Sequence, residues 1–118
     1  MSSLIRGFGA SRMAVGALAW VAPSAAARTF GLRPDSDPVV AQLFGVRDFA
    51  LGALTAISSG AELRQVLRIG VAIDTVDALG CIRRREQLSM HGKLLTAGGA
   101  VLFAAIGVSA LSATATAD

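Results

Sequence analysis

Charged residues are scarce in this chain of 118 residues, where they make up 16% of the sequence. Soluble globular proteins contain about 25% charged residues, most of which lie on the surface. Apolar residues make up 53% of this chain, and the mean hydropathy is +0.61. None of the long apolar segments has the charged face that a soluble helical bundle needs. The scarcity of charge therefore argues against a soluble domain and favours a protein embedded in a membrane.

Residue types that form most catalytic and metal sites are also rare. The single cysteine, Cys81, excludes a disulfide within the chain, and there is only one histidine. One His, one Cys and separated Asp residues do not form a zinc-ligand pattern, so we expect no metal and no cofactor. No nucleophile–base pair and no glycine-rich phosphate loop followed by Lys is recognisable, and we predict no catalytic residue.

The net charge of +3 and the isoelectric point near 10.5 come from arginines that cluster at the ends of apolar segments. This placement is typical of residues that flank membrane helices, and it argues against a phosphate-binding stripe. We therefore expect membrane lipids as partners and no nucleic acid. The most compact basic group is Arg83, Arg84 and Arg85, which is expected to set topology or to bind anionic lipid headgroups.

Four apolar segments predict the architecture. Their approximate bounds are 4–27, 38–59, 62–82 and 91–113. Joined by short connections, they predict a single all-α domain over residues 1–118, an integral membrane antiparallel four-helix bundle in the cell membrane. The positive-inside rule favours termini outside the cytoplasm and the loop with Arg83 inside it.

The first segment has a second interpretation. A basic start, a short apolar centre and small residues near Ala27 are also typical of a cleaved signal peptide over Met1–Ala27. Gly9, Arg12, Gly16 and Ala19 share one face of small residues that suits helix packing, which favours a retained helix. Pro23 favours the start of a short helix after the first span.

Glycines on helix faces mark the expected close contacts between spans. The predicted helix-packing positions are Gly16, Gly45, Gly52, Gly70 and Gly98.

The segment Gly70–Cys81 places two carboxylates, Asp74 and Asp77, on one face of an apolar helix. A turn is predicted at Gly60-Ala61, and residues equally far from this pair lie at equal depth in two antiparallel helices. Arg47 and Asp74 satisfy this condition, so we expect them to pair, with Asp77 one turn away.

The charge count of this expected midplane network is unequal. Three carboxylates, Asp48, Asp74 and Asp77, face one arginine, Arg47, and Arg68 lies within reach of a long side chain. Even with both arginines one carboxylate is left over, and in a low-dielectric environment it binds a proton. The network is therefore either a structural polar cluster with one neutral Asp or a proton-titrating site.

The chain resembles a family of small bacterial and fungal integral membrane proteins that have four predicted helices and no assigned function. The resemblance rests on Ala22-Pro23, Phe30-Gly31-Leu32, the block Gly45-Val46-Arg47-Asp48-Phe49-Ala50-Leu51-Gly52, the pattern Asp74-Thr75-Val76-Asp77-Ala78, and His91-Gly92. It implies a retained first helix and a four-span fold, and it implies no activity.

Three function classes remain. The first is a structural or accessory membrane protein, either a homo-oligomer or part of a larger membrane complex. The second is a small proton-coupled transporter that uses Arg47, Asp74 and Asp77. The third and least favoured is a membrane enzyme that acts on a lipid or a quinone.

Overall fold

The computed structural model describes residues 3–29, 38–83 and 98–115, and within these ranges every residue is helical except Ala22, Ser58 and Ser59. The helices are α1 (Ser3–Val21), α2 (Pro23–Thr29), α3 (Pro38–Ile57), α4 (Gly60–Arg83) and α6 (Gly98–Ala115). The predicted all-α class is confirmed for this part of the chain. The beginning of the fourth predicted span, residues 91–97, lies outside the described residues.

The first predicted span is divided into two helices at Pro23. The Ala22 amide still donates to the Leu18 carbonyl at 2.8 Å, and the Ala26 amide donates to the Ala22 carbonyl at 2.9 Å. Pro23 has no amide hydrogen to continue the first ladder, but its fixed φ suits the first position of a new helix. α1 therefore ends at Val21, and α2 starts in a new direction.

A tight turn connects α3 to α4 at the predicted place. The Ser58 amide donates to the Leu54 carbonyl at 2.9 Å, which closes the end of α3. Gly60 follows with φ +54°, a left-handed conformation that costs a residue with a Cβ atom about 1–2 kcal/mol. The glycine lets the chain reverse within Ser58 and Ser59, so the end of α3 and the start of α4 lie side by side.

Helices α1 and α3 are antiparallel and pack with their backbones in contact. A Cβ atom added to Gly52 would lie 2.5 Å from the Gly9 carbonyl oxygen, and one added to Gly45 would lie 2.6 Å from the Gly16 carbonyl oxygen. These approaches are too short for any side chain, so glycine is required at both ends of the contact. In each helix the two glycines are seven residues apart, which is about two helical turns.

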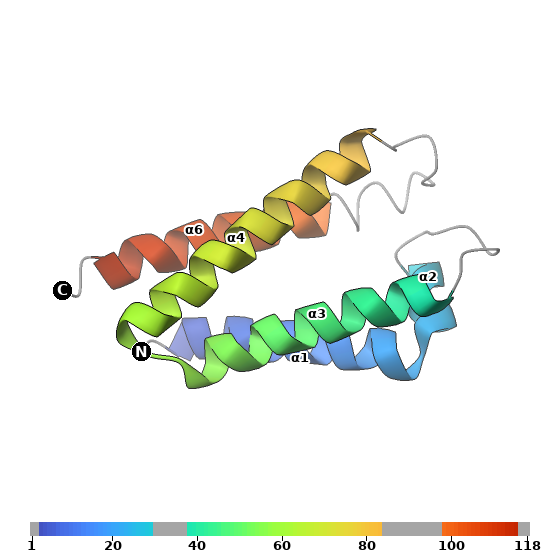
Figure 1. Ribbon diagram of the computed structural model, residues 1–118, viewed down its shortest axis with the longest axis horizontal. Coiled ribbons are helices and arrows are strands. Elements are labelled where there is room, and N and C mark those ends of the chain that lie inside the picture. The colour runs from blue at the N-terminus through green and yellow to red at the C-terminus, as the bar shows by residue number, and fades with distance from the viewer. Residues whose placement is uncertain (1–2, 30–37, 84–97, 116–118) are drawn as a thin grey trace.

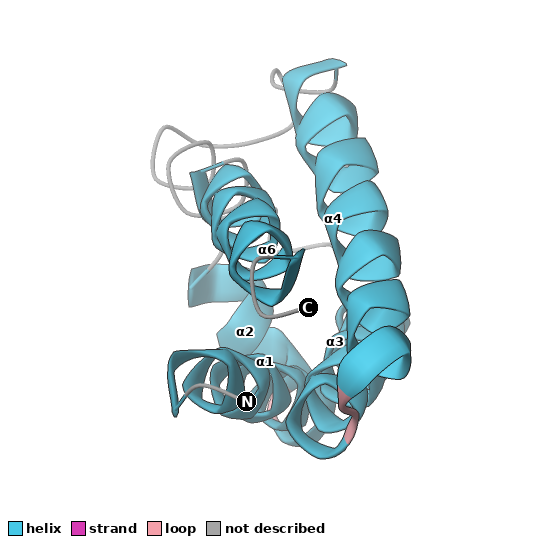
Figure 2. Ribbon diagram, turned by 90° about the vertical axis from the view of Figure 1, so that its left-hand side faces the viewer, coloured by secondary structure: helices cyan, strands magenta, loops and turns pink. Residues whose placement is uncertain are grey.

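Helices α4 and α6 form a second antiparallel pair that lies over the first (Figures 1 and 2). α4 leaves the Gly60 turn close to α3 and then diverges from it along its length (Figure 1). The molecule is therefore two helix pairs that meet at one end and separate toward the other.

The end at which the pairs meet has an apolar core. Buried side chains from α1, α4 and α6 form it, with partly buried residues of α6 packed around them. Its buried members are Ile5, Phe8, Leu63, Leu67 and Ala110.

The outer surface is strongly apolar. Large aliphatic side chains are exposed on every helix longer than α2, for example Val21 at 81%, Ile57 at 78% and Val76 at 67%. Among the described residues, α3 and α6 are long and apolar enough to cross a membrane, judged by length and composition.

Candidate functional site

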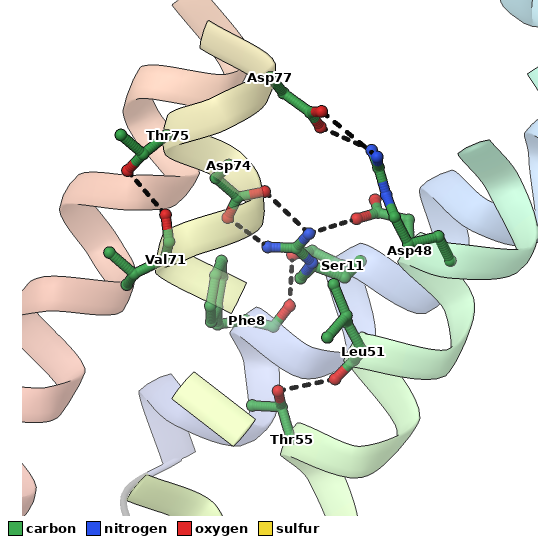
Figure 3. A network of polar contacts seen from close by, with 11 residues as sticks. Phe8, Ser11, Asp48, Leu51, Thr55, Val71, Asp74, Thr75 and Asp77 are labelled. Atoms are coloured by element: carbon green, nitrogen blue, oxygen red, sulfur yellow. Dashed lines mark hydrogen bonds and ion pairs between the residues drawn. The ribbon is translucent and has the colours of Figure 1, made fainter. Parts of the chain in front are cut away.

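A buried ion network lies between the two helix pairs, with the guanidinium of Arg12 at its centre. Arg12 Nη1 donates to Asp74 Oδ2 at 2.6 Å, and Nη2 donates to Asp74 Oδ1 at 3.0 Å. Nη2 also donates to Asp48 Oδ1 at 2.5 Å. Arg12 and Asp48 are 2% and 1% exposed, and Asp74 is 4% exposed. One side chain of α1 thus joins α3 to α4, and Figure 3 shows Asp48 and Asp74 turned toward each other.

Aromatic rings from two helices cover the Arg12 guanidinium. Its Cζ lies 4.9 Å from the ring centroid of Phe103 and 5.8 Å from that of Phe8. The two rings meet edge to face, with centroids 5.5 Å apart. A cation held over aromatic faces gains electrostatic stabilisation, and the gain increases when water is excluded. Through Phe103, α6 also contacts the network.

A second ion pair lies one helical turn away, toward the end at which the helix pairs separate. Arg47 Nη2 donates to Asp77 Oδ2 at 2.6 Å, and Nη1 donates to Asp77 Oδ1 at 3.3 Å. The Arg47 Cζ lies 4.9 Å from the Phe44 ring centroid. The side chains of Arg47 and Asp77 are 34% and 30% exposed. This outer pair is therefore in contact with the surroundings, whereas the inner group is not.

The expected pairing of Arg47 with Asp74 is wrong by three residues. Asp74 is bound by Arg12, and Arg47 binds Asp77 instead. The equal-depth argument assumes that α3 and α4 stay side by side, but α4 diverges from α3 beyond the Gly60 turn. Arg47 therefore reaches Asp77, and the arginine of α1 fills the position beside Asp74.

Several other residues predicted for the network, for helix packing or for headgroup binding do not have the surroundings that the sequence predicted. Arg68 is exposed and makes no ion pair with a described residue, so it is not part of the network. Gly70 is buried, but a Cβ atom added to it would have no neighbour within 4 Å, and the same holds for Gly98, which is exposed. Arg83 is exposed at the end of α4, and Arg84 and Arg85 lie outside the described residues.

Sequence reasoning missed the central residue, Arg12, as a member of the network. It assigned Arg12 to the basic flank of a span, although the same residue shares a face with Gly9, Gly16 and Ala19. A face lined by glycines packs against another helix, so a charged residue on that face must be buried and must have a partner. In α3, Asp48 lies between Gly45 and Gly52 with the same spacing that Arg12 has in α1. This shared spacing could have indicated that Arg12 pairs with Asp48.

A small cleft adjoins the network on the side of the apolar core. It is lined by Arg12 and Asp74 and by apolar or small side chains of all four long helices. The lining is completed by Phe8, Leu51, Thr55, Val66, Leu67, Gly70, Val71, Phe103 and Gly107. No group of three metal-ligating side chains occurs among the residues that the structure describes. The arrangement can hold helices together and can hold protons on its carboxylates.

The fold and the site define an all-helical protein built around a buried arginine–carboxylate network. Residues 9–110 match a family described as a domain of unknown function (DUF4267), and the chain belongs to that family. No curated protein and no solved structure matches the chain. The family match spans both helix pairs and includes every residue of the inner and outer ion pairs.

Proposed function

We propose that the chain is a multi-pass membrane protein with a structural or accessory role, as a homo-oligomer or as a subunit of a larger membrane complex. One observation carries the membrane assignment. The network residues Arg12, Asp48 and Asp74 are at most 4% exposed, while large aliphatic side chains are exposed on every long helix. Charge inside and hydrocarbon outside is the arrangement that suits lipid as the surrounding solvent.

The ion network also supports spans by α1 and α4, which are less apolar than α3 and α6. α4 has 24 residues and α1 has 19, lengths of about 36 Å and 28 Å, close to or above the thickness of a bilayer core. The charges at their centres, Arg12 and Asp74, neutralise each other. With their charges paired in the interior, both helices fit a four-span topology.

The accessory role is supported by the helix pairs. The α1/α3 pair is rigid, because its backbones touch at glycines, and α4 and α6 are attached to it at one end. Apolar side chains such as Leu43 and Leu79 remain exposed on α3 and α4. Such faces suit contact with lipid or with another membrane protein.

Cell fractionation followed by carbonate extraction tests the membrane assignment. We expect the tagged full chain to stay in the membrane pellet, and release into the supernatant would contradict the proposal. The accessory role is tested on the protein purified in mild detergent, by light-scattering mass and by identification of co-purifying chains. A particle of one chain without a partner would contradict it.

A small proton-coupled transporter is the second candidate. The observation that favours it is the excess of carboxylates in the network, three against two arginines. The test is substrate-dependent proton uptake in cells or vesicles with an imposed pH gradient. We expect Asp48→Asn to abolish the uptake and Glu62→Gln, at an exposed carboxylate of α4, to leave it unchanged. Uptake that persists in the Asp48 variant would contradict this candidate.

A further inference from the structure

The three carboxylates of the network are not bound equally. Asp74 accepts two hydrogen bonds from Arg12, and Asp77 accepts two from Arg47. Asp48 accepts one from Arg12 at Oδ1, and its Oδ2 is buried without a hydrogen-bond partner among the described residues. Two carboxylates are therefore paired in bidentate fashion, the geometry that an ionised Asp forms with Arg. The third, Asp48, accepts a single hydrogen bond from the described residues.

The charges around Asp48 do not balance if it is ionised. Among the described residues, the charged groups that act on it are Arg12 from α1, Asp74 from α4 and its own neighbour Arg47, which is held by Asp77. Residues 98–115 of α6 contain no titratable group. Three ionised carboxylates against two guanidiniums would leave one negative charge in a site where Asp48 is 1% exposed. A buried carboxylate without compensation takes up a proton instead of staying charged.

We propose that Asp48 carries a proton on Oδ2, so that the network is a binding site for one exchangeable proton per chain. In this state Asp48 Oδ1 accepts the hydrogen bond from Arg12, and the Oδ2–H completes the neutral carboxyl group. The bidentate pairs Arg12–Asp74 and Arg47–Asp77 are then each neutral, and no charge remains uncompensated. The proton comes from water, and its release returns Asp48 to the carboxylate. This site is independent of the accessory role proposed above.

The exposure of the network provides a route for this proton. Asp77 and Arg47 are about one-third exposed, whereas the inner group is almost fully buried. Arg47 is adjacent to Asp48 in α3, and Asp77 is one turn from Asp74 in α4. Figure 3 shows Asp77 and Asp74 following one another along α4, with Asp48 across from Asp74 on α3. We expect the proton to exchange with water past the outer pair, the least buried part of the network.

Infrared spectroscopy of the purified full chain in detergent at neutral pH tests the proposal directly. A protonated carboxyl group has a C=O stretching band that a carboxylate lacks, and we expect that band in the wild-type protein. Transfer to D2O should shift the band, because the proton exchanges. Absence of the band, or a band that D2O leaves unchanged, would overturn the proposal of an exchangeable proton.

Two variants locate the proton. The charge-balanced double variant Arg47→Gln/Asp77→Asn removes the outer pair and keeps the excess carboxylate of the inner group, so the band should remain. Asp48→Asn should remove the band. Loss of the band in the double variant would place the proton on Asp77, and persistence in Asp48→Asn would place it elsewhere, and either result would overturn the assignment.

Thermal midpoints of two variants distinguish a proton on Asp48 from a proton on Asp74. Asn resembles a neutral Asp, so Asp48→Asn should have the thermal midpoint of the wild type at neutral pH. Asp74→Asn removes the ionised partner of Arg12 and should melt at least about 4 °C lower. The reverse order would place the proton on Asp74 and refute the proposal. A monomeric particle without partners would contradict the accessory role while leaving the infrared result unaffected.

Discussion

The two helix pairs achieve close packing by different means. In the α1/α3 pair, glycines face each other at two levels, and backbone atoms of one helix occupy the space of the other helix's missing side chains. In the α4/α6 pair, the tight glycine contact is at Gly107, and the neighbour is the Val71 side chain. Backbone cannot move away without separating the helices, but a side chain can rotate. The first pair is therefore fixed in register, and the second is adaptable.

The charge network lies where the rigid pair meets the adaptable one. Arg12 and Asp48 lie between the glycine levels of α1 and α3, so their positions are set by the backbone contact. Asp74 belongs to α4, and its bidentate contact with Arg12 holds that helix to the first pair. A fixed arginine can thus hold a helix whose own packing is looser.

The largest expected effect comes from removing the residue that joins the two pairs. Arg12→Met leaves Asp48 and Asp74 buried without a cation, and breaking one side of a buried pair costs about 3–5 kcal/mol. The double variant Arg12→Met/Asp74→Leu should recover much of the loss, because both desolvation penalties disappear. The measurement is the free energy of unfolding in detergent for the full double-mutant cycle.

The same cycle for Arg47 and Asp74 should show no coupling, since the structure places these residues in different ion pairs. Additive losses for Arg12 and Asp74 would instead mean that the two helix pairs are held together by other contacts.

Gly16→Ala should give the next largest effect, a loss of about 1–3 kcal/mol from overpacking. The added methyl group would overlap the Gly45 carbonyl oxygen and lie 2.5 Å from the Phe49 amide nitrogen, so α1 and α3 must separate. Gly7→Ala is the matched control in the same helix, because nothing lies within 4 Å of its added Cβ. The control should stabilise the helix by about 0.5–1 kcal/mol. Equal thermal midpoints for the two variants would contradict backbone contact.

Gly107→Ala tests the adaptable pair and should cost less than Gly16→Ala. Its added Cβ would lie 2.6 Å from Val71 Cγ2, and the valine can relieve the contact by leaving its preferred rotamer, at a cost of about 0.5–1.5 kcal/mol. Thermal unfolding of both alanine variants under the same detergent conditions gives the comparison. If Gly107→Ala proved the more damaging, the assignment of rigid and adaptable pairs would be reversed.

The smallest effect is expected for the outer ion pair. Arg47→Met removes a contact that is one-third exposed, and such pairs contribute about 1 kcal/mol or less. The check is the midpoint shift of Arg47→Met relative to that of Arg12→Met. A loss as large as that of Arg12→Met would show that the outer pair is as important as the inner one.

Much of the fold follows from local pattern. The helix after Pro23, the turn at Gly60 and the packing face with Gly9 and Gly16 depend on residues that act within a few positions of themselves, and the sequence indicates each of them. Hydropathy also predicts the four spans, and α3 and α6 meet the length and composition of a span.

The pairing of charges could not be predicted in the same way. Equal distance from Gly60 sets equal depth only for parallel helix axes, and the angle between α3 and α4 depends on packing by α1 and α6. Nothing local to Arg47 or Asp74 determines that angle. The sequence could have indicated that Arg12 belongs to the network, because its glycine neighbours place it inside a helix contact.

The equal spacing of Gly9, Arg12 and Gly16 in α1 and of Gly45, Asp48 and Gly52 in α3 has a consequence for biosynthesis in a membrane. An arginine that enters the bilayer alone costs at least about 2.5–3.5 kcal/mol. In the four-span topology proposed above, Asp48 arrives with α3 and meets Arg12 inside the bilayer. We therefore expect α1 and α3 to insert together in that topology, because α1 contains no acidic residue to accompany Arg12. The glycines that set the distance between these two helices also bring Asp48 to Arg12 in that topology.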